Sequence, residues 1–300
     1  MGKLYLEKFL TYPVSFEYSH EFIHKLHVLN PKVLLIAVSQ SGETADTLHC
    51  VEMANAVGCQ VIAFCNRSHS LMARLSTKTI DLMCGPEHSV ASTKTFTSSI
   101  FNFYLFSISV AKSRGLLMRA EYNQLIGEVR KTALFIRETS QEKNAAAALA
   151  SMLAKFNSLY FIGRKWLLPM ALEAAHKCKE LTYLHAEGYP SAELKHGAIS
   201  MIGSDFPTVI LVSDDETIER MVATAKEIKA RSGILYIVGP QKLSEQFKFA
   251  DSYFAVPAHI PDLQPIVTNI FLQYMNYFLA LKLERNVDQP RNLAKTVTVE

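Results

Sequence analysis

The sequence has little that would indicate a membrane or a nucleic-acid partner. Its most apolar stretch, residues 100–110, is interrupted by Asn102 and Ser107 and is shorter than the roughly 20 residues that cross a bilayer. The start, MGKLYLEKFL, has no continuous apolar core and does not resemble a secretory signal. The net charge is only +3, without a long basic run. We therefore expect neither a membrane nor a nucleic acid among the partners.

Cysteine and glycine motifs are equally sparse. The five cysteines have no CxxC or CxxH spacing, and four lie in apolar or helical stretches, which is typical of free thiols in a reducing cytoplasm. The sequence has no GxGxxG, no Walker lysine and no cluster of zinc ligands, so we expect no nucleotide, metal or organic cofactor. With 300 residues, 49% of them hydrophobic, the chain is long enough for two globular domains.

A strand–helix–strand unit is predicted early in the chain. Residues 33–38 form a near-continuous apolar run, the pattern of a strand covered on both faces. Residues 44–57 have helical spacing and end at Gly58, and residues 60–64 form a second short strand. Such a βαβ unit predicts a parallel sheet and an α/β fold.

The same unit recurs later. Residues 208–213 predict a strand, residues 217–231 a helix that stops at Gly233, and residues 234–238 the next strand. The segments LIAVSQSGETADTL and VILVSDDETIERMV align, which favours duplication of one domain. The alternative is that unrelated βαβ units look alike.

Helices are predicted between the two copies, over residues 92–113, 120–139 and 141–155. The second copy then opens with a strand in SLYFIGR, a helix over 167–181, a short strand near Tyr183 and a helical turn over 192–196. Only residues 1–31 precede the βαβ unit of the first copy. We expect the first domain to lack an opening strand and loop, and the chain to start inside that domain.

The polar loop after the first strand suits a phosphate monoester. Ser39, Ser41 and Thr44 supply hydroxyls and Gln40 an amide, while Gly42 lets the backbone approach a ligand closely. The loop lies at the carboxyl end of a strand and opens a helix, whose free N–H groups attract anions. The alternative is that Ser41 or Thr44 only caps the helix.

A second hydroxyl cluster lies in SVASTKTFTSS, which also precedes a helix. It forms either a capped helix start with Lys94 on the solvated face or a second wall of the same phosphate or sugar pocket. Its hydroxyl residues are Ser89, Ser92, Thr93 and Thr95.

Four motifs together resemble one enzyme family. SQSGETADTL, VASTKTFT, ALEAAHKCKELTYLHAEGYPSAELKHG and DQPRNLAKTVTVE are similar to the sugar-isomerising half of glutamine–fructose-6-phosphate aminotransferases, over essentially the whole chain. The resemblance implies two SIS (sugar isomerase) domains, each a mainly parallel sheet flanked by helices. We expect them over residues 1–140, incomplete at the N-terminus, and 141–285, with a catalytic tail over 286–300.

The resemblance also implies an activity. It would be the conversion of fructose 6-phosphate and ammonia to glucosamine 6-phosphate, through a lysine Schiff base and a C1–C2 proton transfer. This reaction feeds hexosamine and UDP-N-acetylglucosamine synthesis, in a cytoplasmic homodimer without a cofactor. In the family a glutaminase domain supplies the ammonia, and that domain is absent from these 300 residues.

Glu180 and Lys177 share one helix face. From the residues alone they read as an ordinary surface ion pair, or as a carboxylate whose pKa rises toward that of a useful base through partial burial. The resemblance assigns Glu180 as the base that moves the C1–C2 proton. It places Lys177 in the active site, near the charge of the intermediate.

His196 and Lys295 also depend on the resemblance. A lone histidine is more often structural, and a terminal lysine is normally solvated. The resemblance implies that His196 opens the sugar ring and reaches the site of a neighbouring subunit. It makes Lys295 the Schiff-base lysine on a tail that closes the pocket with Ala294. The matching sugar contacts are Val90 and Ser92, and the matching phosphate contacts are Ser39, Gln40, Ser41 and Thr44.

Departures from the family leave alternatives open. The missing opening strand and glutaminase domain suggest a piece of a longer enzyme, and Ala198 stands where the family commonly has proline. The alternatives are a phosphosugar-binding module without catalysis, an inactive fragment, and a deglycase of fructosamine phosphates. Retention of the three residues assigned to chemistry argues against a simple sensor (Glu180, His196 and Lys295).

Overall fold

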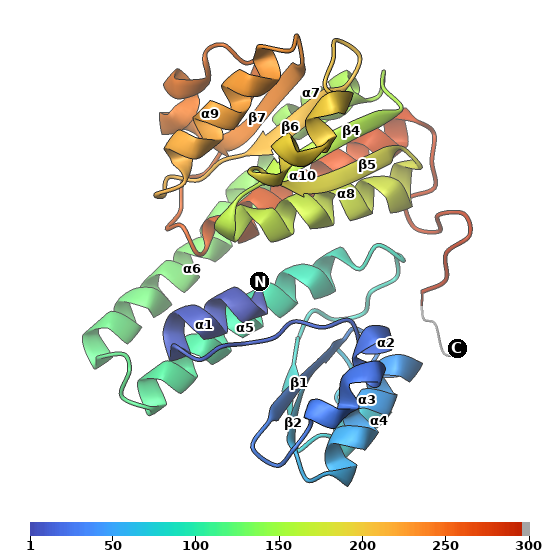
Figure 1. The fold of residues 1–300 in the computed structure, drawn as a ribbon, viewed down its shortest axis with the longest axis vertical. Coiled ribbons are helices and arrows are strands. Elements are labelled where there is room, and N and C mark those ends of the chain that lie inside the picture. The colour runs from blue at the N-terminus through green and yellow to red at the C-terminus, as the bar shows by residue number, and fades with distance from the viewer. Residues whose placement is uncertain (296–300) are drawn as a thin grey trace. The chain divides into compact units, whose positions relative to one another are not determined.

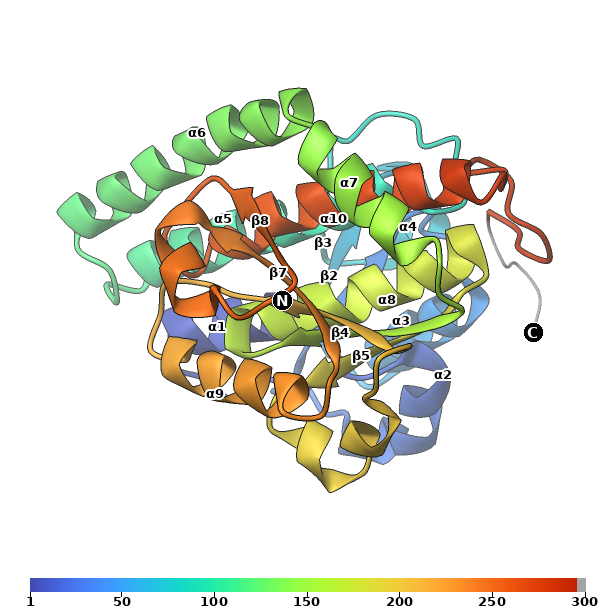
Figure 2. The same ribbon diagram turned by 90° about the horizontal axis from the view of Figure 1, so that it is seen from above.

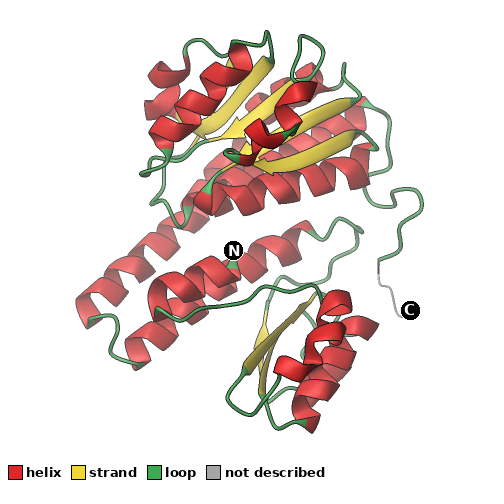
Figure 3. Cartoon of the chain, viewed as in Figure 1, coloured by secondary structure: helices red, strands yellow, loops and turns green. Residues whose placement is uncertain are grey.

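A computed structural model describes residues 1–295, and the chain divides into two compact units. Unit 1 comprises residues 118–290 with Met1, and unit 2 comprises residues 2–117 with the segment that begins at Arg291. Figures 1 and 3 show that each unit has its own sheet and its own helices. Within residues 1–295, no helix is long and apolar enough to cross a membrane.

Unit 1 is built around a five-stranded parallel sheet in the order β5-β4-β6-β7-β8. Every residue of the central strand β6 is buried, as expected for a strand with neighbours on both edges and helices on both faces. The strands are β4 (Ser158–Gly163), β5 (His185–Pro190), β6 (Pro207–Leu211), β7 (Ile234–Pro240) and β8 (Ser252–Val256).

Helices cover both faces of this sheet. Figure 2 shows α9 on one face and α7, α8 and α10 on the other. On the α9 face, Ile210 and Val212 form a core with Met221 of the helix. The α-helices are α6 (Arg119–Gln141), α7 (Asn144–Leu153), α8 (Leu168–Thr182), α9 (Ile218–Lys229) and α10 (Gln264–Lys282). The 3₁₀ turns are η2 (Lys165–Leu167), η3 (Glu193–His196), η4 (Ala198–Met201) and η5 (Gln241–Phe247).

Unit 2 contains a smaller parallel sheet in the order β1-β2-β3. On one face Ala37 and Val61 pack against Val51 of α3. On the other, Phe64 stacks on Phe103 of α5 at 4.1 Å between ring centroids. The strands are β1 (Leu34–Ser39), β2 (Gln60–Cys65) and β3 (Lys78–Asp81), and the helices are α1 (Gly2–Leu10), α2 (Ser19–Phe22), η1 (Ile23–Val28), α3 (Ala45–Ala56), α4 (Leu71–Leu75) and α5 (Thr93–Ser113).

The predicted βαβ units and long helices are confirmed, and the structure places two local features more exactly. The strand expected near Tyr183 begins at His185, because Tyr183 has a left-handed φ of 64° and terminates α8. α9 ends at Lys229, Ser232 after it holds the left-handed conformation at φ 58°, and the Gly233 N–H donates to the Ile228 carbonyl at 3.1 Å. Gly58 does follow the end of α3, at φ 79°.

The structure shifts the correspondence of the two copies by one residue from the alignment of LIAVSQSGETADTL with VILVSDDETIERMV. Ala37 lies on the α3 face of its sheet, and Ile210 lies on the α9 face of the other. Matching these faces pairs Ala37 with Ile210 and brings Glu43-Thr44 onto Glu216-Thr217. Gln40 rather than Ser39 therefore corresponds to Ser213.

The first copy lacks the counterparts of both β4 and β5, one strand more than expected. β1 therefore lies at an edge of its sheet, whereas β6 pairs with β4 and β7. Val38 of β1 is 46% exposed, while its counterpart Leu211 is 1% exposed. Opening one edge of the sheet thus exposes apolar side chains that the complete sheet buries.

Candidate active site

The hydroxyl-rich loop, residues 39–44, follows β1 in unit 2 and is held by its own hydroxyls. The Gly42 N–H donates to Ser39 Oγ at 3.0 Å, and the Glu43 N–H donates to Ser41 Oγ at 3.2 Å. Ser39 Oγ and Thr44 Oγ1 lie 3.2 Å apart. Both serines are buried, so the turn presents a compact group of hydroxyls at the carboxyl end of the strand.

Gly42 is required for this turn. Its φ is 67°, and a Cβ there would lie 2.1 Å from Ser70 Oγ. The Gly42 carbonyl accepts a hydrogen bond from the Met72 N–H at 3.1 Å, and Glu43 Oε1 accepts one from the Leu71 N–H at 2.9 Å. The loop is thereby fixed against the start of α4, with its glutamate turned to that helix rather than to a ligand.

The first turn of α3 supplies an anion-binding geometry. Thr44 is the N-cap residue but makes no capping hydrogen bond through its side chain. Within residues 1–295, the N–H groups of Ala45, Asp46 and Thr47 have no acceptor. The alternative in which Thr44 caps the helix through its side chain therefore does not hold, and the free donors suit a phosphate group.

The second hydroxyl cluster precedes α5 and is shaped by Glu87, a residue that sequence reasoning missed. The Glu87 carboxylate accepts hydrogen bonds from the Thr95 N–H at 2.9 Å and the Lys94 N–H at 3.2 Å, and from Thr95 Oγ1. It thus caps α5, while Ser92 is the N-cap residue in a left-handed conformation at φ 53°. Eight residues separate Glu87 from Thr95, beyond the spacing of local capping motifs.

Lys295 reaches this cluster from the far end of the chain. Its Nζ donates to Ser92 Oγ at 2.7 Å and to the Ser89 carbonyl at 2.5 Å. Ala294 beside it is exposed, and Val90 is half-buried. The structure therefore brings together three predicted site residues of unit 2, namely Val90, Ser92 and Lys295; residues 296–300 of the predicted tail lie outside the described part.

Asn66 connects the hydroxyl-rich loop to the segment that precedes the second hydroxyl cluster. Its N–H donates to the Gln40 carbonyl at 3.3 Å, its Nδ2 donates to the Gly85 carbonyl at 2.7 Å, and its Oδ1 accepts from the Cys84 N–H at 3.2 Å. The loop after β2 is therefore a bridge between the loops after β1 and β3. The sequence signal was a lone asparagine after a strand, too common to single out.

In unit 1, α8 carries a compact cluster of charges. Lys177 Nζ lies 2.7 Å from Glu180 Oε2 and 3.8 Å from Glu173 Oε1, and His176 Nε2 lies 2.7 Å from Glu180 Oε1. The Lys177 and Glu180 side chains are only 11% and 16% exposed. The predicted pair of Lys177 and Glu180 is therefore present, and it lies in a larger, mostly buried network.

The pKa values within this cluster differ from expectation. Burial raises the pKa of Glu180, but the hydrogen bond from His176 and the charge of Lys177 outweigh it, so the pKa is lowered. The expectation of a raised pKa at Glu180 is wrong for this reason. Burial does raise the pKa of Glu173, against the opposing charges of Lys177 and His176. The environment thus drives the two carboxyl groups in opposite directions.

His196 lies apart from this cluster. It is exposed at the end of η3, and no hydrogen bond or ion pair within residues 1–295 involves its ring. Its neighbour Lys195 pairs with Glu227 at 2.7 Å, so that lysine is structural. Unit 1 alone therefore does not bring His196 to Glu180.

The unit 1 counterpart of the hydroxyl-rich loop has different chemistry. Asp215 Oδ1 accepts from the Thr217 N–H at 2.8 Å, and Asp214 and Glu216 pair with Lys242 and Lys165. Carboxylates at these positions repel a phosphate. Duplication has therefore left only one of the two loops suited to an anion.

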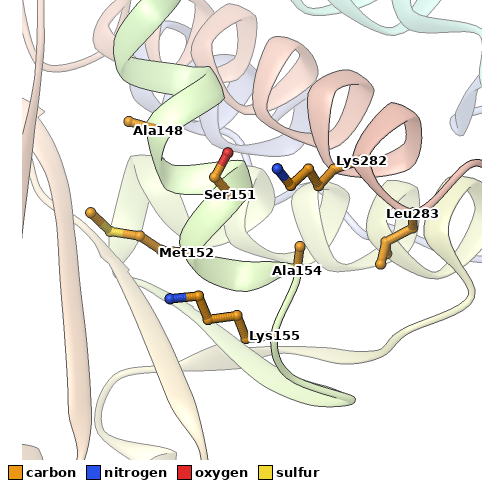
Figure 4. A pocket seen from close by; sticks show the side chains of 7 residues that line it. All are labelled: Ala148, Ser151, Met152, Ala154, Lys155, Lys282 and Leu283. Atoms are coloured by element: carbon orange, nitrogen blue, oxygen red, sulfur yellow. The ribbon is translucent and has the colours of Figure 1, made fainter.

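The described residues include no candidate metal centre, and an open depression in unit 1 is lined by none of the predicted residues. No group of three His, Cys, Asp or Glu side chains in residues 1–295 could hold a metal ion. An open depression of about 600 Å³ in unit 1 is lined by residues that include Ser151, Lys155 and Lys282 (Figure 4). It lies where α7 and α10 end, and we interpret its lysines as complements to those helix termini.

Comparison with known proteins identifies the relatives of this chain. It is 35% identical over 300 residues to the glutamine–fructose-6-phosphate aminotransferase [isomerizing] of Bacteroides thetaiotaomicron, and 37% identical over 304 residues to that of Leifsonia xyli. All of this chain is covered in both cases, against 49% of each relative. The chain therefore spans about half the length of these curated relatives.

Solved structures point to the same relatives as the sequence comparison. The C-terminal domain of glucosamine-fructose-6-phosphate aminotransferase from Francisella tularensis superposes with a TM-score of 0.90 at 29% identity, over 96% of this chain and 82% of that one. A Clostridium difficile protein of the phosphosugar isomerase fold gives a TM-score of 0.79 at 19% identity, over 97% of this chain and 82% of that one, which shows the fold alone. The SIS domain family matches residues 1–109 and 152–283. This chain belongs to the SIS domain family.

Proposed function

We propose that this chain performs the isomerase part of glucosamine-6-phosphate synthesis, from fructose 6-phosphate and ammonia. The observation that carries the proposal is the contact of Lys295 Nζ with Ser92 Oγ at 2.7 Å. It brings a primary amine to the second hydroxyl cluster, within the unit that also holds the hydroxyl-rich loop. A free helix N-terminus at α3 and a lysine within one unit suit a phosphorylated keto sugar.

The resemblance to the family supplies the chemical roles of the side chains. Residues 39–44 and the α3 terminus would hold the phosphate. Lys295 would condense with the C2 carbonyl, which releases water, and ammonia would displace the lysine and leave nitrogen on C2. Glu180, kept ionised by its neighbours, would take a proton from C1 and return it to C2, which yields the 2-amino aldose. Lys177 would stabilise the negative charge that develops on the sugar oxygen.

Assembly and location belong to the same proposal. His196 is exposed and has no partner in the described chain, which supports a role as the ring opener of a second copy in a homodimer. The relatives are twice as long, so we propose that a glutaminase domain supplies ammonia in the whole protein. All five cysteines are free thiols, four of them buried, which supports a reducing cytoplasm as the location.

Reduction with borohydride tests the proposal directly. The full chain is incubated with fructose 6-phosphate and borohydride, and a peptide that contains Lys295 should carry the mass of the reduced sugar adduct. Lys295→Arg keeps the charge but cannot form the adduct, and it should lose glucosamine 6-phosphate formation by about 100-fold or more. Adduct formation at other lysines, or activity retained in Lys295→Arg, would exclude this mechanism.

Product analysis separates the alternatives. Glucosamine 6-phosphate from added ammonia supports the synthase, while release of fructose 6-phosphate only from fructosamine phosphates supports a deglycase. Stabilisation by fructose 6-phosphate without any product would leave a phosphosugar-binding module. If the sugar phosphate raises the temperature of no thermal unfolding transition, the chain alone is an inactive fragment.

A further inference from the structure

Both carboxylate oxygens of Glu180 are occupied by side chains of its own helix. Oε1 lies 2.7 Å from His176 Nε2, and Oε2 lies 2.7 Å from Lys177 Nζ. A carboxylate that acts as a base needs one oxygen free to face the proton that it removes. One of the two partners must therefore yield before Glu180 can act.

The two partners differ in how firmly they are held. Lys177 is 11% exposed and also lies 3.8 Å from Glu173 Oε1, so its ammonium group is held between two carboxylates. The His176 side chain is 59% exposed, and within residues 1–295 Glu180 is the only hydrogen-bonding partner of its ring. Water replaces a lost hydrogen bond far more easily at an exposed group than at a buried one. His176 is the partner that can leave.

The elements packed against α8 carry other ionisable side chains, and several of these are already paired. The elements packed against α8 are β4, β5, α10 and η2. On β5 His185 pairs with Glu187 at 3.7 Å, and on η2 Lys165 pairs with Glu216. The remaining ionisable groups of these elements are Tyr160 on β4, Tyr189 on β5, and Tyr274, Tyr277 and Lys282 on α10.

We propose that His176 is a positioning residue that sets the basicity of Glu180 and holds it in place until the substrate displaces the imidazole from Oε1. The inference rests on the proposed function, since it assumes that Glu180 moves the sugar proton. A protonated imidazole stabilises the carboxylate, which agrees with the lowered pKa of Glu180.

Removal of the imidazole should therefore change the pKa of Glu180 and the pH profile of kcat in a predictable direction. In His176→Leu, Glu180 loses a hydrogen bond and a positive neighbour, so the pKa of its carboxyl rises. The acid limb of the kcat profile should move to higher pH by about 0.5 to 1 unit, a threefold to tenfold loss of rate on that limb. The plateau at higher pH should stay or increase, because the carboxylate is a stronger base with a free oxygen.

The experiment compares three variants of the full chain. His176→Leu removes the hydrogen bond and the charge, and His176→Gln keeps a donor without the charge and should move the limb less. His185→Leu is the matched control, because that histidine also faces a glutamate but does not contact Glu180. Isomerisation of fructose 6-phosphate is measured from pH 5 to 9 at saturating sugar.

A second readout does not depend on activity. The carboxyl carbon of Glu180 is followed by NMR in protein labelled with ¹³C-glutamate, with Glu180→Gln to assign the signal. Its titration midpoint should rise in His176→Leu and stay unchanged in His185→Leu. A merely structural role of His176 would lower the melting temperature without moving this midpoint.

The outcomes separate the two proposals. An unmoved acid limb and an unmoved NMR midpoint in His176→Leu would overturn this inference, and so would an equal shift in His185→Leu. If Glu180→Gln keeps full isomerisation activity, the role of Glu180 in the proposed function fails instead. A shifted midpoint together with an inactive Glu180→Gln supports both.

Discussion

At the scale of single residues, His259 shows how burial fixes a protonation state. Its side chain is 1% exposed, and its Nδ1 accepts the Ile260 N–H at 2.8 Å. The proton of the neutral ring must therefore reside on Nε2, which lies 2.9 Å from Thr132 Oγ1. Burial lowers the pKa of His259, and the charge of Glu128 3.7 Å away opposes the shift without reversing it.

This lowered pKa predicts a pH-dependent stability. Below the ordinary histidine pKa of about 6.5, the unfolded chain binds a proton that folded His259 refuses. The free energy of unfolding should therefore fall as the pH decreases from about 6.5 toward the lowered pKa, by up to about 1.4 kcal/mol per pH unit. Urea unfolding at several pH values measures the slope. His259→Gln should flatten it in this window, while the exposed His185→Gln should not.

Two glycines form a matched pair for a second prediction. Gly42 has φ 67° and no room for a Cβ, whereas Gly127 lies inside α6 with nothing within 4 Å of an added Cβ. Gly42→Ala should destabilise by at least about 1–2 kcal/mol and weaken sugar phosphate binding. Gly127→Ala should stabilise by about 0.5–1 kcal/mol. Equal melting temperatures for the two variants would contradict the role of Gly42 in shaping the loop.

At the scale of elements, the sequence predicted those with a strong local pattern. The buried runs of β1 and β6 and the helical spacing of α5, α6 and α8 were enough. β3 was missed because KTID is short and mostly exposed, so it carries no hydrophobic pattern. The capping of α5 by Glu87 and the effect of His176 on Glu180 were missed because both depend on contacts in space.

The Glu87 cap can be tested by itself. Glu87→Gln keeps the size of the side chain but replaces a charged acceptor at a helix N-terminus with a neutral one. The free energy of unfolding should fall by about 0.5–2 kcal/mol. Glu245→Gln serves as the control, because that glutamate forms an ion pair in which both side chains are more than 70% exposed. A loss of the same size in Glu245→Gln would show that Glu87 has no special role.

The open edge of the small sheet predicts a contrast between homologous positions. Val38→Lys places a charge on an exposed edge strand and should lower self-association while changing stability by less than about 0.5 kcal/mol. Leu211→Lys buries an unpaired charge in the complete sheet and should prevent folding. Light scattering and thermal melts compare the two variants with the parent chain. Unchanged scattering in Val38→Lys would mean that the edge does not drive association.

At the scale of the whole molecule, the division into two units predicts two unfolding transitions. Unit 1 has the five-stranded sheet and the larger core, so it should unfold at the higher temperature. Fructose 6-phosphate should raise the temperature of the lower transition. At 100 times its dissociation constant, the sugar adds about 2.7 kcal/mol to the free energy of unfolding of the unit that binds it. Calorimetry with and without the sugar measures both. A single transition would show that the units unfold together, and an unshifted lower one that unit 2 does not bind.

Unit 2 contains segments from both ends of the chain, which has a consequence during synthesis. Ser92 and Lys295 touch although 203 positions separate them along the chain, and residues 118–290 of unit 1 are translated in between. At roughly 5–20 residues per second, a ribosome takes about 10 to 40 s to cover that interval. For that time the nascent hydroxyl loops exist without their lysine. A sugar phosphate bound by the nascent protein then would be held but not converted, and enzyme activity should appear only after the binding loops have folded.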